Sequence, residues 1–325
     1  MLGKVPPDAL EAHVLDRAGA RLDSVRQGPA YGEDAAAIEV EDGTLVVSSD
    51  PLSLAADRVG TLAVHVACND VAASGGDPTW LTNIIFLPGE ADSSVLERIT
   101  KQVDDAAADM GVSIVGGHSE YNPTLDRPLL TMTCMGMADP FVPTGGANTG
   151  DRVILTKGAG IEGTAILATD FEAELLDAGV NPSLIASAAD FYADIGVTAE
   201  GNIVRQWATA MHDPTEGGLI DALLELASAS EVSVTVDEEA IPIREQTKVL
   251  TDAMDVDPLN IFGSGALLAT VPESALEEVL SALAAANIEV APIGRVTAES
   301  PGTLLLGTER ITEPVRDDMY RLWDS

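Results

Sequence analysis

Apolar residues recur along the first 140 positions in patterns that predict a regular succession of strands and helices. Strands are expected at 36–49 (two, around an Asp42-Gly43 turn), 80–88, 112–117 and 129–138. Helices are expected at 58–74 and 93–111, each followed or closed by glycine. This order of elements is typical of an α/β or α+β domain.

A stretch rich in proline and glycine, 140–151, predicts a domain boundary. Strands and helices alternate again beyond it. They are a strand at 152–158, helices to about 230, strands at 232–236 and 265–271, a helix at 273–286, and strands near 288–296 and 303–307. We therefore expect an N-terminal segment 1–27, two α/β domains at 28–142 and 150–310, and a tail 311–325.

The composition is that of a chain with a sizeable core, because 46% of its 325 residues are hydrophobic. No apolar run approaches the roughly 18 residues of a membrane span, and the N-terminus lacks an apolar signal core. Cys68 and Cys134 lie in apolar surroundings and are expected to be buried thiols. These features predict a cytoplasmic protein.

The net charge is −36, from 53 acidic and 17 basic residues, of which four are lysines. Such a field disfavours binding to nucleic acid or to an anionic membrane. Self-repulsion would also destabilise the fold unless salt screens it, which indicates an organism with molar salt in its cells. An anionic ligand would need metal ions to bind so acidic a chain.

Acidic residues interrupt the apolar pattern at several places. Asp34 follows Glu33 in a segment that is also typical of a surface turn, and Asp50 ends a strand, where caps and metal ligands are equally common. Asn69 and Asp70 are more informative, because they interrupt an otherwise apolar helix and a buried carboxylate needs a cation or strong donors.

Histidines and glycines accompany these acids. His65 lies on the same helical face as Asn69 and fits either a core histidine or a ligand. Gly116 and Gly117 end an apolar strand just before His118, where a backbone can approach a ligand or His118 can make a local structural contact. A Gly-Ser-Gly stretch at 263–265 precedes another strand and fits a bulge or a ligand contact.

The segment HDPTEGGL, 212–219, predicts a helix start, with Asp213 as N-cap, Pro214 as the first helical residue and Glu216 completing a capping box. This leaves Gly217 and Gly218 unexplained, because glycine in a helix costs about 1 kcal/mol relative to alanine. A phosphate approaching the backbone at a helix N-terminus would explain the pair.

The chain contains no phosphate-binding loop of the GxxxxGK type and no serine nucleophile motif. Four acids without a basic cradle (Asp34, Asp50, Asp70 and Asp213) instead fit Mg²⁺ carrying a polyphosphate. The metal would supply the positive charge that the chain lacks.

Six segments, taken in order, resemble the serial motifs of the aminoimidazole ribonucleotide synthetase (PurM-like) superfamily. They are GEDAAAI, SSDPL, NDVAASGGDPTWLT, VGGHSE, HDPTEGGL and GSGALLATV, spread over about residues 28–310. The sequence looks most similar to the hydrogenase-maturation protein HypE and its archaeal AIR synthase-related relatives.

The resemblance implies a two-domain PurM-like α/β (α+β) fold, whose N-terminal domains pair into a β-barrel across a homodimer. It implies an ATP site near that interface, with Mg²⁺ as cofactor. The implied roles are metal-side acids at Asp34, Asp50 and Asp70, nucleotide or phosphate contacts at Asn69, Gly116, Gly117, Gly217 and Gly218, and catalytic or phosphate-end residues at His118 and Asp213.

Departures from the motifs shape the functional hypothesis. HypE proteins end in a reactive cysteine, whereas this sequence ends RLWDS, so we expect a reaction other than dehydration of a carbamoylated tail cysteine. Thiamine-monophosphate kinases carry an acid at the position of His118, so this sequence departs from their motif there.

The leading hypothesis is a Mg-ATP-dependent enzyme that phosphorylates an oxygen of a small-molecule substrate. The alternatives are a non-catalytic nucleotide-binding partner in a HypE-like maturation complex with another protein, a thiamine-monophosphate kinase-like enzyme, and a structural dimer without nucleotide affinity.

Overall fold

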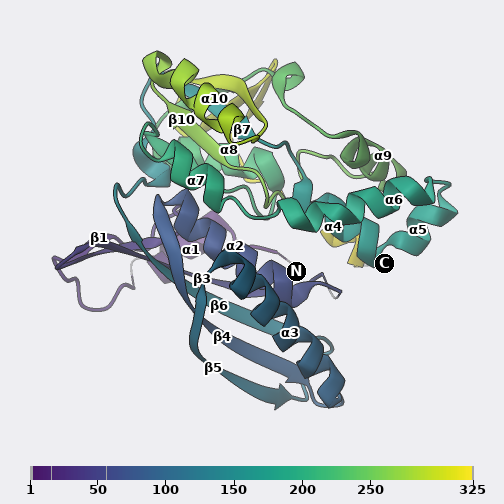
Figure 1. Ribbon diagram of the computed structural model, residues 1–325. Coiled ribbons are helices and arrows are strands. Elements are labelled where there is room, and N and C mark those ends of the chain that lie inside the picture. The colour runs from purple at the N-terminus through teal and green to yellow at the C-terminus, as the bar shows by residue number, and fades with distance from the viewer. Residues whose placement is uncertain (1–2, 16, 56, 324–325) are drawn as a thin grey trace.

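The computed structural model describes residues 3–15, 17–55 and 57–323, which form two α/β units (Figure 1). Within these residues, the N-terminal sheet has six strands in the order β1-β2-β3-β6-β4-β5. The strands are β1 (Val25–Gln27), β2 (Ala36–Val40), β3 (Gly43–Leu52), β4 (Gly76–Pro88), β5 (Ser113–Asn122) and β6 (Leu129–Ala138). Only the β4–β5 pair is parallel among these described strands.

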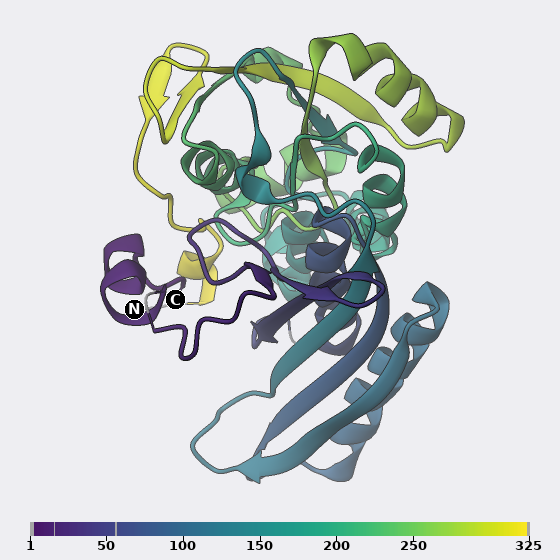
Figure 2. The same ribbon diagram turned by 90° about the vertical axis from the view of Figure 1, so that its left-hand side faces the viewer.

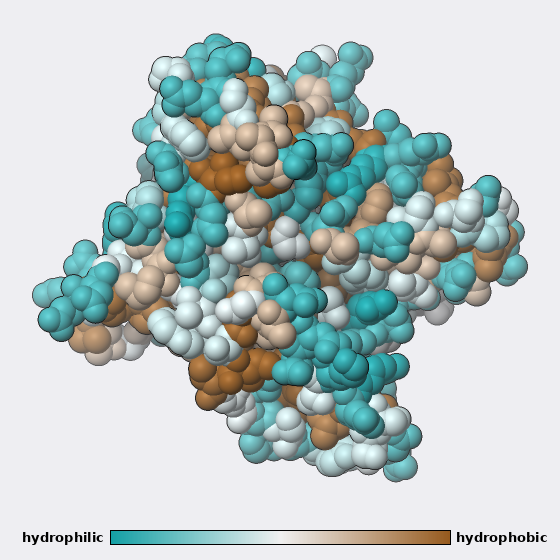
Figure 3. All heavy atoms as spheres, viewed as in Figure 1, coloured by the Kyte–Doolittle hydropathy of each residue, from teal (hydrophilic) through white to brown (hydrophobic). Residues whose placement is uncertain are grey.

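Helices α2 (Val59–Ala73) and α3 (Ser93–Met110) cover one face of this sheet. Residues of β6 alternate between buried and partly exposed, because one face lies under the helices and the other is open. On the open face Trp80 and Ile84 remain 38% and 39% exposed. At the edge, apolar side chains gather over β5 (Figure 3), where Ile114 and Val115 are exposed.

The C-terminal sheet has seven strands in the described residues, in the order β13-β12-β9-β11-β7-β10-β8, and its β9–β12 pair is parallel. The strands are β7 (Arg152–Thr156), β8 (Ala210–His212), β9 (Ser233–Val236), β10 (Leu268–Val271), β11 (Val290–Thr297), β12 (Thr303–Leu306) and β13 (Glu309–Ile311). The helices are α4 (Ile161–Asp170), α5 (Glu172–Asp177), α6 (Pro182–Ala189), α7 (Thr198–Val204), α8 (Gly218–Ala229), α9 (Glu245–Met254), α10 (Leu276–Ala285) and α11 (Tyr320–Trp323).

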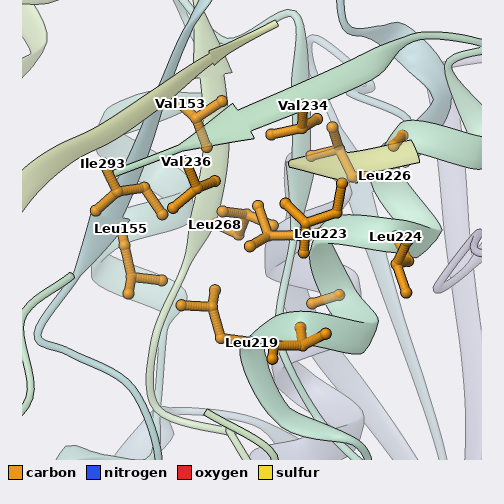
Figure 4. Packing of buried hydrophobic residues seen from close by; sticks show 14 of the residues in the cluster. Val153, Leu155, Leu219, Leu223, Leu224, Leu226, Val234, Val236, Leu268 and Ile293 are labelled. Carbon is orange, nitrogen blue, oxygen red and sulfur yellow. The ribbon is translucent and has the colours of Figure 1, made fainter. Parts of the chain in front are cut away.

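The core of this unit lies between α8 and the sheet (Figure 4). Leu219, Leu223 and Leu226 of α8 are buried on one helical face, as their spacing predicts, and pack with Val153 and Val234 of the strands. Packing against the sheet rather than helix propensity therefore fixes α8.

Most elements agree with the sequence pattern, and several differ in extent. Helix α3 begins after Asp92, whose side chain accepts a hydrogen bond from Ser94 N, and ends at Gly111 in the left-handed conformation, as expected. The strand predicted at 112–117 continues to Asn122, because the polar residues after the glycines still pair with β4.

Helix α2 also joins the two units. The buried side chain of Asn69 donates from Nδ2 to Ile195 O at 2.9 Å and accepts from Val197 N at 2.9 Å. The described ends of the chain lie side by side (Figure 2), and a Cβ on Gly3 would lie 2.9 Å from the ring of Tyr320. Lys4 N donates to Glu216, in the segment after β8, at 2.6 Å. None of the helices described is both long enough and apolar enough to span a bilayer.

Candidate functional site

A cavity of about 1360 Å³ lies where the two units and the N-terminal segment meet. Its walls come from the start of the chain, the loop 31–34, the end of β3, helix α2, the segment after β8, and residues 312–316. Three of the acids singled out by sequence, Asp34, Asp50 and Asp70, line it.

Asp70 and Asp50 share one donor. Ser48 of β3 faces α2, and its hydroxyl donates to Asp70 and to Asp50, the latter at 3.1 Å. Asp70 is only 5% exposed. Burial, and then the charges of Asp50 and Asp213, raise the pKa of Asp70 well above its usual range. Asp70 therefore lacks the positive charge that its ionised form requires.

Asp213 does not line the cavity itself, but its neighbour His212 does, and its carboxyl interacts with that of the cavity residue Asp70. It is fully buried directly after β8, and no N–H or hydroxyl group among the described residues bonds to either of its carboxylate oxygens. Burial, followed by the charge of Asp34, raises the pKa of Asp213 to about 8. A carboxylate in this position needs a proton or a cation.

The predicted helix start at Asp213 and Pro214 is wrong. Helix α8 begins at Gly218, with Gly217 as its N-cap in the left-handed conformation at φ 81°. Asp213 is therefore not a helix cap, and its buried carboxylate makes no capping hydrogen bond to α8.

The structure provides a packing reason for the glycine pair. A Cβ atom on Gly218, whose φ is 64°, would lie 2.4 Å from Leu259 O. Gly217 N donates to Asp317 at 3.0 Å, so this amide already has an anionic partner from the chain itself. The phosphate contact expected of Gly217 and Gly218 stays a prediction, and it would require Asp317 to move.

His212, the last residue of β8, lies between two carboxylates. Its Nδ1 lies 2.7 Å from Asp34 and its Nε2 lies 3.0 Å from Glu225, and the residue is 2% exposed. Burial alone would lower the pKa of His212, but Asp34 and Glu225 raise it well above its usual value. The ring is therefore an imidazolium that donates from both nitrogens.

Lys4 supplies a second cation at the other end of this arrangement. Its Nζ lies 2.9 Å from Glu225 and 3.3 Å from Asp221, both on α8. Burial raises the pKa of Glu225, but Lys4 and His212 outweigh it and lower that pKa to about 2. Glu225 thus remains ionised in a nearly closed environment.

His212, Glu225 and Lys4 were not identified as site residues from the sequence. Asp221 and Glu225 interrupt the apolar face of α8 in the way that Asp70 interrupts α2, so the same signal was present. Nothing in the local pattern indicates Lys4, because its partners lie more than 200 positions away.

Other predicted residues lie away from the cavity. Asn69 uses both ends of its amide on the backbone of 195–197, which gives it a structural role in this chain. His65 packs against Gly196, and burial followed by Lys157 lowers its pKa to about 4, as befits a neutral core histidine.

The segment with Gly116, Gly117 and His118 lies on the edge strand β5 and does not line the cavity. His118 is 63% exposed and pairs with Glu120 at 3.1 Å. A Cβ on Gly117 would lie 2.1 Å from Asn83 O, so close pairing with β4 requires this glycine. Within one chain, these residues and the acids are not brought together.

No group of three or more histidine, cysteine, aspartate or glutamate side chains in the described residues is arranged to hold a metal ion unaided. Mg²⁺ commonly takes only one or two carboxylates and completes its shell with water and phosphate oxygens. The unpartnered oxygens of Asp213 beside Asp70 fit that type of incomplete site.

Comparisons with known proteins agree with this architecture. The profile of the AIR synthase related protein, N-terminal domain, matches residues 32–138, and that of the C-terminal domain matches residues 148–307. The carbamoyl dehydratase HypE of Rhizobium leguminosarum bv. viciae is 32% identical over 82% of this chain and 78% of its own length. A Methanocaldococcus jannaschii protein named for hydrogenase expression/formation is 28% identical over 89% and 88%.

Solved structures share the fold at lower sequence identity. A HypE–HypF complex superposes with a TM-score of 0.76 at 21% identity, covering 95% of this chain and 99% of that one. HypE in complex with ATP gives 0.68 at 24% identity, covering 95% and 94%. AaThiL complexed with AMPPCP and TMP gives 0.71 at 22% identity, covering 86% and 89%.

These matches confirm the two-domain PurM-like α/β fold. With both domain profiles matched in order and a relative above 30% identity, the chain belongs to the AIR synthase-related (PurM-like) family.

Proposed function

We propose that this protein binds Mg-ATP in the cavity between its two units and transfers a phosphoryl group to an oxygen of a small substrate. The observation that carries the proposal is Asp213, a fully buried carboxylate that accepts from no N–H or hydroxyl group of the described residues and lies beside Asp70 of the cavity wall. ATP or AMPPCP in structures of the same fold supports the nucleotide as ligand.

Different residues of the site would have different roles in holding a metal–phosphate complex. Asp70 and Asp213 would be ligands, while Ser48 orients the carboxylates of Asp50 and Asp70. His212 holds Asp34 at the cavity wall. Bound Mg²⁺ would neutralise phosphate charge, which is the main requirement of phosphoryl transfer.

A homodimer would complete the site. His118 pairs with Ile84 in the sheet and so shares the open face with Trp80 and Ile84. Because this face is apolar and uncovered, we infer that it packs on a second copy. His118 and the two glycines before it would then approach the nucleotide of that copy, which one chain alone does not allow.

The experiment is a calorimetric titration of ATP in molar KCl with and without Mg²⁺, using wild type and Asp70→Asn. We expect Mg-dependent binding by wild type and none by the variant. No binding by a folded wild-type protein would overturn the proposal. Binding without turnover, even with cell extract added, would instead support a nucleotide-binding partner of a maturation complex. Phosphorylation of thiamine monophosphate would identify a kinase of the ThiL type.

Light scattering of Ile84→Asp tests the dimer. We expect this variant to be monomeric, while Leu176→Asp, at an apolar residue of α5 that is 42% exposed, keeps the wild-type mass. A monomeric wild type would contradict the inferred interface.

A further inference from the structure

The N-terminal segment of residues 3–15 forms part of the cavity wall, yet it contributes little to the hydrophobic core. Its helix α1 (Pro7–Leu10) and the following π-helical turn (Glu11–Leu15) contain no buried residue. Val5 and Leu10 nevertheless line the cavity. Burial of apolar surface therefore does not explain why this segment lies across the site.

Lys4 ties the segment to the body of the protein through polar contacts. Its backbone N donates to Glu216 at 2.6 Å, and its Nζ reaches Glu225 at 2.9 Å and Asp221 at 3.3 Å. The Lys4 side chain is 40% exposed, whereas those of Asp221 and Glu225 are 4% and 9% exposed. The two acids thus depend on a cation that belongs to a weakly packed segment.

Glu225 connects Lys4, through His212, to Asp34, which is one of the expected metal-side acids. One of its oxygens, Oε1, accepts from Lys4, and the other, Oε2, accepts from His212 Nε2 at 3.0 Å. The opposite nitrogen of His212 holds Asp34 at 2.7 Å. A continuous series of charged hydrogen bonds therefore runs from Lys4 to Asp34, and each member fixes the next.

We propose that Lys4 is a positioning residue for Asp34, acting through Glu225 and His212, so that docking of the N-terminal segment and binding of Mg-ATP strengthen each other. This rests on the proposed function for its ligand. Because coupling between two sites is reciprocal, Mg-ATP should hold the segment against the cavity as firmly as the docked segment improves Mg-ATP binding.

Two measurements test the proposal, using Lys4→Met, Lys4→Arg and the control Lys101→Met, which removes an exposed ion pair with Asp105 on α3. The first is the NMR signal of the His212 ring N–H groups in the ligand-free protein with labelled histidine. The second is the Kd of Mg-ATP by calorimetry, together with hydrogen exchange of residues 3–15.

We expect Lys4→Met to shift or broaden the His212 signals and to weaken Mg-ATP binding by about 5- to 20-fold. Lys4→Arg should restore most of both, and Lys101→Met should change neither. In wild type, Mg-ATP should slow exchange in the N-terminal segment.

Unchanged His212 signals and an unchanged Kd in folded Lys4→Met would overturn the coupling. If wild type binds no Mg-ATP, the proposed function fails, and the His212 signals alone then decide whether Lys4 positions this series of residues. A weaker Kd with unaltered His212 signals would also refute the route through Glu225.

Discussion

Replacing Asp213 by asparagine keeps the shape of the side chain and removes its charge. In a site that binds Mg-ATP, this change should abolish metal-dependent binding. In the ligand-free protein it should increase stability, because the wild-type carboxylate is buried among other acids and accepts from no N–H or hydroxyl group of the described residues. A gain in stability with a loss of binding is typical of a residue that serves a ligand rather than the fold.

The magnitude follows from the pKa of Asp213, which burial and then Asp34 raise from 3.8 to about 8. Between those values the native state keeps a proton that the unfolded chain has lost, so stability falls as the pH rises from 4 to 8. At about 1.36 kcal/mol per pKa unit, the full effect above pH 8 would be on the order of 6 kcal/mol. Neighbouring acids share protons with Asp213, so we expect the variant to be more stable by about 2–3 kcal/mol at pH 8.5 and by little at pH 5.

Urea unfolding in molar KCl at both pH values measures this difference, with Asp104→Asn on the exposed side of α3 as the control. The salt screens surface charges but leaves the buried cluster largely unscreened. An Asp213→Asn protein that is less stable than wild type at pH 8.5, or one that still binds Mg-ATP, would refute the reasoning.

Three further predictions concern the fold and its charge. Asn69→Ala should lower the free energy of unfolding by about 2–4 kcal/mol in urea, because two buried backbone groups at 195–197 lose their partner; an unchanged value would show that the contact is absent. Gly218→Ala should lower the free energy of unfolding by more than about 2 kcal/mol, since its Cβ would lie 2.4 Å from Leu259 O. Gly111→Ala, whose Cβ would lie in open space, should lower it by about 1 kcal/mol. Lowering KCl from molar to about 0.1 M lengthens the Debye length from about 3 to about 10 Å, so the repulsion among the acidic residues increases and Tm should fall markedly. A constant Tm would mean that the net charge of −36 does not destabilise the fold.

Two acids of the site could be identified from the sequence because they contradict their local patterns. Asp70 interrupts an apolar helix and Asp50 follows an apolar stretch near the end of β3, and the structure places both on one cavity with Asp34. Charge in an otherwise buried element is expensive, so such positions indicate function more reliably than exposed acids do.

Tertiary contacts determine the three features that the local sequence pattern did not predict. The capping signal at Asp213 was overridden because the segment 259–261 packs on the backbone of Gly218 and delays the start of α8. The position of His118 depends on strand order, which places β5 at an edge. The contact of Lys4 with α8 joins residues at opposite ends of the sequence, and only the folded chain reveals it.

The charges around the cavity lead to a last prediction, on proton release. Burial and neighbouring carboxylates hold the pKa of Asp70 well above its usual range and that of Asp213 at about 8, so Asp213 carries a proton at pH 7 in the absence of metal. A metal ion binds the ionised form, and Mg-ATP must therefore displace about one proton from Asp213. Titrations of wild type at pH 7 and at about pH 9.5, each in two buffers with different heats of ionisation, measure that number. Zero protons released at pH 7, or the same number at both pH values, would mean that the phosphates are held elsewhere. A release at pH 7 that disappears at about pH 9.5, where the Asp213 carboxyl is already ionised, would indicate that this acid exchanges its proton for the metal.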